Sequence, residues 1–336
     1  MALIDDMTST AASYPRLLGD IGGTNARFGW LAGPGEAPGA VDSYRCADYP
    51  SLQDAMRHYL DAKGLPPPRW CAIGIANPVV GDLVRMTNHD WQFSIEDVRA
   101  RFGMDRFLVI NDFTALALAL PALAPADLRQ VGPGAAVAHS PLGLIGPGTG
   151  LGVSGLLPAR GGRSAIPING EGGHVTLAGA SALEDAVLAR LRARFGHASA
   201  ERAISGPGLV NLYTALCELE GATPEPFDAA AVTARSGAGG DARCVQAVEL
   251  FFSLLGTVAG NLALSLGARG GMYIGGGIVP RLGDRIDRSA FRERFEAKGR
   301  FRDYLRGIPT FVVQASTSPA LLGAARALED LQETTT

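Results

Sequence analysis

Two glycine-rich turns between apolar strands, one at the start of each half of the chain, restrict the fold more than any other feature. The first lies in LLGDIGGTNARF, Leu17 to Phe28, and the second in PLGLIGPGTGLGVSGLL, Pro141 to Leu157. Glycine loses more backbone freedom on folding than other residues, so a cluster at a turn indicates a left-handed conformation or a close backbone approach. The recurrence of this unit predicts two similar halves that face one another across a cleft.

The composition is typical of a globular α/β protein long enough for two domains. Of the 336 residues, 47% are hydrophobic and 44 are glycine. The net charge of -3 gives no support for a surface that binds nucleic acid or an anionic membrane. Basic residues are densest between Arg281 and Arg306. Because acidic residues are interleaved with them, we expect a solvent-exposed helix face there.

The sequence predicts a cytoplasmic location. The four cysteines are far apart and fit no metal-binding or redox spacing, which favours reduced thiols. The opening MALIDDMTST carries acids where a signal peptide would carry basic residues. The most apolar stretch, Leu250 to Ala268, contains Asn261 and several glycines, which indicates a buried helix rather than a membrane span.

The first turn is a candidate phosphate-binding site. Gly22, Gly23, Thr24 and Asn25 would present backbone and side-chain hydrogen-bond donors to an anion. Asp20 beside them suits a hydrated Mg²⁺, which prefers oxygen ligands and keeps most of its waters. A P-loop is excluded because its lysine is absent, and a Rossmann turn because a strand follows. A plain β-turn is the alternative for this segment taken alone.

The second turn favours phosphates held from two sides. The alternating glycines of 146–152 surround Thr149 and again leave bare backbone between two strands. A third glycine run, 275–277, follows an apolar strand, and its flat backbone suits contact with an adenine ring. An ordinary turn at the strand end is the alternative for this third run.

Asp112 is the candidate general base. It ends the apolar strand in RFLVIND, and ligands bind at strand ends in open α/β sheets. Phosphoryl transfer to a hydroxyl requires a carboxylate that accepts or orients its proton. The alternative is that Asp112 only caps a helix expected from Thr114.

Glu171 and His174, three residues apart among glycines, suit a polyol better than a metal. Glu201 is uninformative by itself.

Taken together, these motifs resemble those of the bacterial glucokinases, members of the sugar kinase and actin-like ATPase superfamily. The likeness runs from about Leu17 to Leu328 and includes GDIGGTNARF, MTNHDWQFS, NDFTA, GPGTGLGV, GEGGHV, SAERAISGPGLVNLY, GNLALSLG, GGIVPR and FEAKGRF. It implies an α/β fold of the actin-like ATPase (ribonuclease H-like) type, with two domains and a central cleft. We expect a small domain at 15–112 with 316–332, a large domain at 113–315, and a flexible arm at 1–14.

The resemblance also implies ATP as phosphoryl donor, Mg²⁺, glucose phosphorylated on its 6-hydroxyl, and usually a homodimer. The positions that match the nucleotide-binding motifs are Gly19, Asp20, Ile21, Gly22, Gly23, Thr24, Gly148, Thr149, Gly150, Gly275, Gly276 and Gly277, with Asp20 holding the metal through water. The positions that match the sugar ligands are Asn111, Asp112, Glu171, His174 and Glu201, with Asp112 as base. Glu201 enters only through this resemblance.

Two kinds of alternative remain from the sequence. One is a kinase for another hexose, or one that uses polyphosphate as donor. The other is a sugar-binding sensor without catalysis. The carboxylate at Asp112 argues against the sensor, because binding alone does not require a base.

Overall fold

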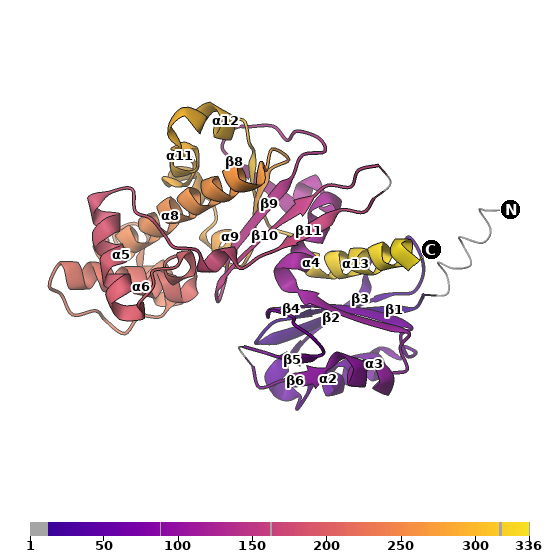
Figure 1. Ribbon diagram of the computed structural model, residues 1–336. Helices are drawn as coiled ribbons and strands as arrows, with labels where there is room; N and C mark the ends of the chain where they lie inside the picture. Colours follow the sequence, from indigo (N-terminus) through magenta and orange to yellow (C-terminus); the bar gives the residue numbers. More distant parts are fainter. Residues whose placement is uncertain (1–12, 88, 162, 316–317, 336) are drawn as a thin grey trace. The chain divides into compact units, whose positions relative to one another are not determined.

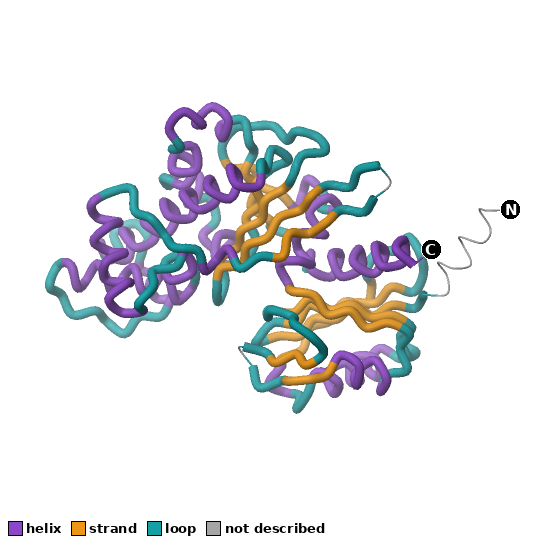
Figure 2. Tube along the Cα trace, viewed as in Figure 1, coloured by secondary structure: helices purple, strands orange, loops and turns teal. Residues whose placement is uncertain are grey.

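The chain folds into two compact units, seen in a computed structural model that describes residues 13–87, 89–161, 163–315 and 318–335 (Figures 1 and 2). Most of the expected N-terminal arm, residues 1–12, lies outside the described residues. The first unit comprises Met1–Leu123 and Ala315–Thr336, and the second comprises Ala124–Gln314. Helix α4 (Asp112–Ala119) therefore belongs to the first unit, whereas the sequence suggested a boundary between residues 112 and 113, inside this helix.

The first unit is built on a five-stranded sheet in the order β3-β2-β1-β4-β7. Its strands are β1 (Arg16–Ile21), β2 (Asn25–Leu31), β3 (Gly39–Arg45), β4 (Trp70–Ile75) and β7 (Arg106–Asn111). The β1–β2 pair is the predicted antiparallel hairpin, and β4 and β7 run parallel to β1. A separate two-stranded sheet pairs β5 (Leu83–Arg85) with β6 (Gln92–Ser94). A short 3₁₀ turn, η1 (Cys46–Asp48), follows β3.

Helices cover both faces of this sheet (Figure 1). On one side lie α2 (Leu52–Lys63) and α3 (Ile95–Arg101), and on the other lie α4 and α13 (Pro319–Thr335). Successive strand residues point to opposite faces. Leu17 accordingly packs into the core under α2, whereas Leu18 packs against Leu321 of α13, and all three are fully buried. Both faces of β1 are therefore apolar.

The second unit contains a six-stranded sheet in the order β11-β10-β9-β12-β13-β8. Its strands are β8 (Leu128–Val131), β9 (Leu142–Pro147), β10 (Leu151–Leu157), β11 (Ile166–Asn169), β12 (Met272–Ile274) and β13 (Thr310–Val313). The predicted second hairpin is confirmed as the antiparallel pair β9–β10. The sequence interpretation did not anticipate β8, β11 or β13, which are only four residues long.

Helices and short turns make up the rest of the second unit. The helices are α5 (Ala182–Phe195), α6 (Gly206–Leu219), α7 (Ala229–Arg235), α8 (Ala242–Leu266), α9 (Ile278–Leu282), α10 (Arg285–Arg288), α11 (Phe291–Glu296) and α12 (Arg302–Arg306). The 3₁₀ turns that matter for the site are η4 (Gly172–His174) and η5 (Ala200–Arg202).

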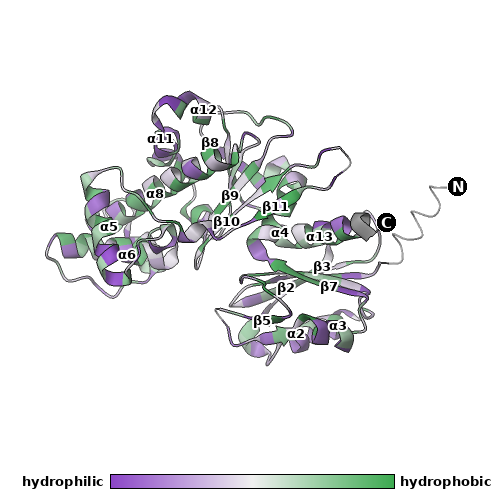
Figure 3. Cartoon of the chain, viewed as in Figure 1, coloured by the Kyte–Doolittle hydropathy of each residue, from purple (hydrophilic) through white to green (hydrophobic). Residues whose placement is uncertain are grey.

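Helix α8 is the central helix of the second unit. Within the described part of the chain, it is the one helix long and apolar enough to cross a membrane by length and composition (Figure 3). Phe251, Phe252 and Leu255 of α8 are nevertheless fully buried in the core of the unit. A side chain at Gly256 would lie 2.2 Å from the carbonyl oxygen of Phe291, so α11 packs directly on the α8 backbone. The burial predicted for this stretch is confirmed.

The basic region between Arg281 and Arg306 is not simply a solvated face, and that expectation is wrong for its central residues. Arg292 Nε donates to Glu296 Oε1 at 2.7 Å, and their side chains are only 13% and 11% exposed. Arg294 Nη2 donates to Glu184 Oε2 at 3.0 Å, and the Glu184 side chain is 3% exposed. Long stems let arginine reach inward, so the first ion pair lies within α11 and the second joins α11 to α5.

Candidate functional site

The β1–β2 turn is closed by hydrogen bonds to its own backbone and to η1. Gly22 N donates to Asn25 O at 2.9 Å, and Cys46 N donates to Thr24 O at the same distance. The Cys46 thiol donates to Gly22 O at 3.3 Å. Thr24 and Asn25 are exposed at the tip. The turn is thus a braced loop whose polar tip faces solvent, where an anion would approach.

Asp20 lies on β1, directly before this turn, and one of its carboxylate oxygens is engaged. Asp20 Oδ2 accepts a hydrogen bond from Ser318 Oγ at 2.5 Å and lies 3.3 Å from Arg27 Nη1. Arg27 is the cross-strand partner of Asp20 in the β1–β2 register. The Asp20 side chain is 25% exposed. Both partners of the carboxylate therefore use the same oxygen.

Asp112 lies at the same edge of the first sheet as Asp20. Because β1, β4 and β7 are parallel, their carboxyl ends meet at one edge, and Asp20, Gly74 and Ile110 lie in register. A side chain at Gly74 would come within 3.2 Å of Ala115 Cβ and 3.5 Å of Asp112 Cα. The glycine thus lets the first turn of α4 lie against β4, next to the end of β1.

Burial is the main cause that raises the pKa of Asp112, to about 6, and the negative charge of Asp20 adds to it. A hydrogen bond from Phe113 N to Asp112 Oδ1, at 2.9 Å, acts in the opposite direction. The carboxylate is therefore ionised at neutral pH yet has a higher proton affinity than an ordinary aspartate. A proton acceptor near neutral pH needs this property.

Asn111, not Asp112, is the N-cap of α4, so the capping alternative for Asp112 is wrong. Asn111 Oδ1 accepts from Phe113 N at 2.9 Å and from Thr114 N at 3.2 Å. Its Nδ2 donates to Asn77 O at 3.4 Å. The helix consequently begins at Asp112, two residues earlier than the sequence suggested. Asp112 is free of the capping role and is presented on the first helical turn.

In the second unit, the Glu201 carboxylate contacts the β9–β10 turn. Leu151 N donates to Glu201 Oε2 at 2.9 Å, and a side chain at Gly150 would lie 2.5 Å from the same oxygen. The turn itself is closed by Gly148 N donating to Gly150 O at 2.8 Å. Gly206 N at the start of α6 donates to Gly148 O at 2.8 Å. The glycines thus allow both a carboxylate and a helix start to contact the turn.

Glu171 and His174 lie at the two ends of η4, which contacts η5, the turn that carries Glu201 about 30 residues later. A side chain at Gly173 would lie 2.1 Å from Leu151 O, so only glycine lets η4 rest on β10. Ala200 N donates to Val175 O at 2.9 Å, which ties the segment after η4 to η5. Glu171 and His174 are exposed. The second unit therefore gathers two carboxylates and an imidazole near one turn, a set that suits sugar hydroxyls.

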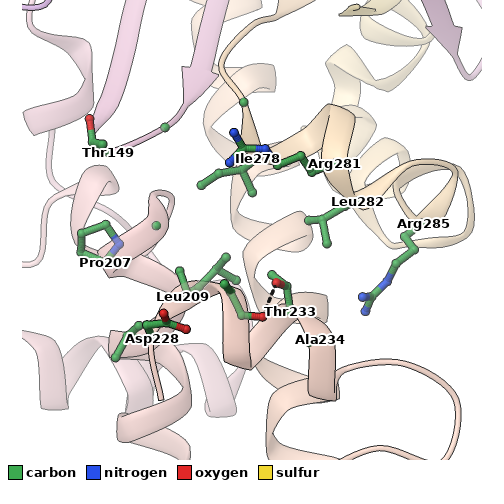
Figure 4. Close-up of a pocket in the computed structure, with 16 residues that line it drawn as sticks. Thr149, Pro207, Leu209, Asp228, Thr233, Ala234, Ile278, Arg281, Leu282 and Arg285 are labelled. Carbon is green, nitrogen blue, oxygen red and sulfur yellow. Dashed lines mark hydrogen bonds between the residues drawn. The ribbon is translucent and has the colours of Figure 1, made fainter. Parts of the chain in front are cut away.

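A pocket of about 930 Å³ adjoins the β9–β10 turn, and Thr149 is part of its lining (Figure 4). It is lined by residues of the β9–β10 turn, α6, α7 with its cap, α9 and α10: Gly148, Thr149, Gly206, Pro207, Leu209, Val210, Asp228, Ala229, Ala230, Thr233, Ala234, Gly277, Ile278, Arg281, Leu282 and Arg285. Its volume and mostly apolar lining suit a nucleobase with its ribose. All of these residues belong to the second unit.

Of the third glycine run, only Gly277 lines the pocket. Gly275 N donates to Ile145 O at 2.8 Å, which continues the sheet. Gly276 has φ +75°, and a side chain there would lie 2.3 Å from Pro147 O. Gly276 therefore serves the close packing between the end of β12 and the end of β9.

The sequence interpretation missed the polar residues of the pocket, which come from three separate helices. Asp228 Oδ1 caps α7 by accepting from Ala231 N at 2.7 Å. Arg285 Nη1 donates to Ser236 Oγ at 2.7 Å, so its guanidinium is fixed beside the pocket. Arg281 of α9 also lines the pocket (Figure 4). No local motif signalled them, because only tertiary packing brings α7, α9 and α10 together.

The donor set around Asp20 fits a magnesium ion held mainly by water and phosphate. Both nearby acids, Asp20 and Asp112, offer carboxylate oxygens, which Mg²⁺ prefers. Among the residues that the structure describes, His, Cys, Asp and Glu side chains nowhere gather in groups of three or more. Such an arrangement suits an ion that keeps most of its waters better than one enclosed by protein ligands.

Comparisons with known proteins agree on one family. Residues 17–331 match the family model described as Glucokinase. A glucokinase of Aromatoleum aromaticum is 54% identical over 96% of this chain and 97% of its own length, and one of Chromobacterium violaceum is 52% identical over 96% and 92%. The crystal structure of a glucokinase from an Antarctic psychrotroph has a TM-score of 0.85 at 36% identity, covering 94% of this chain and 99% of that one.

Proposed function

The chain belongs to the glucokinase family and is an ATP-dependent glucose kinase with the actin-like ATPase fold, and from this premise we propose the roles of its residues. In this proposal Asp112 is the base. It accepts the proton of the glucose 6-hydroxyl as that oxygen bonds to the γ-phosphorus of ATP and the bond to ADP breaks. The observation that carries the proposal is its position beside Asp20, with a pKa of about 6.

We propose that the two braced turns bind phosphates. The tip of the β1–β2 turn, with Thr24 and Asn25, and the Gly148–Gly150 turn offer backbone and hydroxyl donors to negative charge. The pocket beside Thr149 takes the adenosine, with Gly277 against the base. Asp20 holds Mg²⁺ through water, and the ion when bound neutralises charge on the phosphates. Support for Asp20 comes from its place at the carboxyl edge of the first sheet, with Ser318 and Arg27 both bound to its Oδ2.

The sugar ligands stay a prediction that the local geometry supports. Glu171, His174 and Glu201 gather at one turn of the second unit, as a polyol site requires. Asn111 already holds the start of α4 through its Oδ1. We therefore propose that Asn111 contacts sugar only through its Nδ2, which has two hydrogens and one weak partner.

A homodimer and a cytoplasmic location complete the proposal, and sedimentation of the purified chain would test the dimer.

Replacing Asp112 tests the central assignment. Asp112→Asn keeps the size and the acceptor for Phe113 N but removes the base, so kcat should fall about 10²–10⁴-fold. Glucose affinity, measured by quenching of tryptophan fluorescence or by calorimetry, should change little. A variant with near-normal kcat would refute the role of Asp112.

The sugar assignment is tested by ADP release in a coupled assay with Mg-ATP. Glucose should be turned over faster than mannose, fructose or N-acetylglucosamine. Preference for another hexose would move the assignment to that sugar. Glucose binding without turnover of any sugar would favour a sensor or a different phosphoryl donor such as polyphosphate.

A further inference from the structure

We infer that Ser318 is a positioning residue for Asp20: its hydroxyl holds one oxygen of the carboxylate so that the other is presented to the metal–nucleotide complex. The inference rests on the proposed role of Asp20 and extends it to a residue far away in the sequence. Nothing in the local sequence around Ser318 signals such a role. It follows from three contacts within the first unit.

The first contact is the hydrogen bond itself. Ser318 Oγ donates to Asp20 Oδ2 at 2.5 Å, a length typical of a strong bond to a carboxylate. Arg27 Nη1 approaches the same Oδ2 at 3.3 Å from the opposite strand. With two donors on Oδ2, rotation of the carboxylate is restrained and Oδ1 is left for another ligand. A ligand carboxylate is oriented in this way by neighbouring hydrogen bonds.

The second contact fixes Ser318. Leu321 N donates to Ser318 O at 3.1 Å, so Ser318 leads directly into the first turn of α13. Leu321 is fully buried against the sheet, next to Leu18. The hydroxyl therefore comes from a residue anchored by a packed helix rather than from a free loop.

The third contact joins the same helix to Asp112. A side chain at Gly323 would lie 1.7 Å from Ala115 O, so α13 and α4 touch backbone to backbone. Asp112 opens α4, three residues before Ala115. The start of α13 therefore connects two contacts. Ser318, just before the helix, bonds to Asp20, and Gly323 packs against α4, the helix that carries Asp112. The segment Ser318–Gly323 sets the positions of both carboxylates.

The test compares Ser318→Ala with Ser318→Thr, which keeps the hydroxyl. Binding of Mn²⁺ to the enzyme with a non-hydrolysable ATP analogue is measured by electron paramagnetic resonance, which requires no turnover. Ser318→Ala should weaken Mn²⁺ binding about 3- to 10-fold, the effect of one lost hydrogen bond. The Mg²⁺ concentration for half-maximal activity should rise by a similar factor, and Ser318→Thr should restore both.

Ser51→Ala is the matched control. Ser51 Oγ also donates to an aspartate, Asp54 Oδ2, at 2.6 Å, and it caps α2 in the same unit. This variant should lower the melting temperature but leave Mn²⁺ binding unchanged, which separates general destabilisation from a change at Asp20. Equal Mn²⁺ affinity in Ser318→Ala and wild type would overturn the inference.

Asp20→Asn distinguishes failure of the inference from failure of the proposed function. If Asp20→Asn weakens Mn²⁺ binding and Ser318→Ala does not, Asp20 holds the metal without help from Ser318. If Asp20→Asn also leaves Mn²⁺ binding unchanged, the metal role of Asp20 is itself refuted.

Discussion

Asn111 and Asp112 are neighbours in sequence but contribute differently to the proposed site. Asn111 Oδ1 accepts from the N–H groups of both Phe113 and Thr114, whereas the Asp112 carboxylate accepts only from Phe113 N. Asp112 then stands on the first helical turn, near the positive end of the helix dipole, which favours its ionised form. Burial opposes ionisation and dominates, so the net effect is the raised pKa. A sequence reading could find the pair, but not which member caps the helix.

The raised pKa of Asp112 predicts how activity depends on pH. A base must be ionised to accept a proton, so kcat/KM for glucose should fall tenfold per pH unit below about 6. An ordinary aspartate would show this decline only near pH 4. Initial rates between pH 5 and 8, at saturating Mg-ATP, measure the midpoint. A profile flat down to pH 4.5 would contradict the assignment.

The raised pKa of Asp112 also predicts how the free energy of unfolding depends on pH. The folded protein holds the Asp112 proton more tightly than the unfolded chain, so its contribution to the free energy of unfolding falls as pH rises from about 4 to about 6. Above that range the buried charge costs on the order of 2–3 kcal/mol. Asp112→Asn should therefore melt at a higher temperature than wild type at pH 7.5, and at a similar temperature at pH 4. A lower melting temperature at pH 7.5 would contradict this expectation.

At the scale of the elements, η4 shows how glycines position a polar cluster. Gly173→Ala should displace η4, because the new methyl group would meet Leu151 O at 2.1 Å and backbone yields poorly. Since Glu171 and His174 flank this position, KM for glucose should rise about tenfold or more. Gly170→Ala is the control, because a side chain there meets nothing within 4 Å. Identical glucose KM values for the two variants would argue against a sugar site at η4.

The sequence predicts helix ends and tight turns well, because a single capping residue or glycine is enough to fix them. Ser51 and Gly64 bound α2 through signals that are visible in the sequence, because a side-chain cap and a left-handed C-cap act within a few residues. Both glycine-rich hairpins were likewise predictable. Short edge strands such as β11 and β8 were not, since four residues carry too little pattern. The burial of Arg294 also escaped prediction, because its partner Glu184 lies 110 positions earlier.

At the scale of the whole molecule, the pocket proposed for the nucleotide lies entirely within one unit. We therefore expect an ATP analogue without glucose to slow amide hydrogen exchange at the start of α6, in α7 and in α9. Exchange in α2 and α3 should not change, which provides an internal control. Mass spectrometry of exchanged peptides measures both. Protection confined to the first unit would contradict the placement of adenosine in this pocket.

Less of the site than of the fold could be predicted from the sequence. Asp20, Asp112 and both turns carry local signals, because a strand end and a glycine cluster are visible in a few residues. Glu201, Asp228 and Ser318 carry none. Their positions depend on segments that come together only after folding, so their local sequence resembles that of an ordinary helix start or cap.

Helix α13 has a consequence for the order in which the protein matures on the ribosome. The face of the first sheet formed by Leu18, Leu31 and Ala72 is covered by residues 321–328, which are translated after the whole second unit. While the second unit is being translated, α13 is not yet available to cover this apolar surface. The hydrogen bond between Ser318 and Asp20 cannot form during this time either. The second unit has all of its residues before the first does. The amino-terminal half of the enzyme is therefore the part completed later, and it is the part that a chaperone acting during synthesis would have to shield.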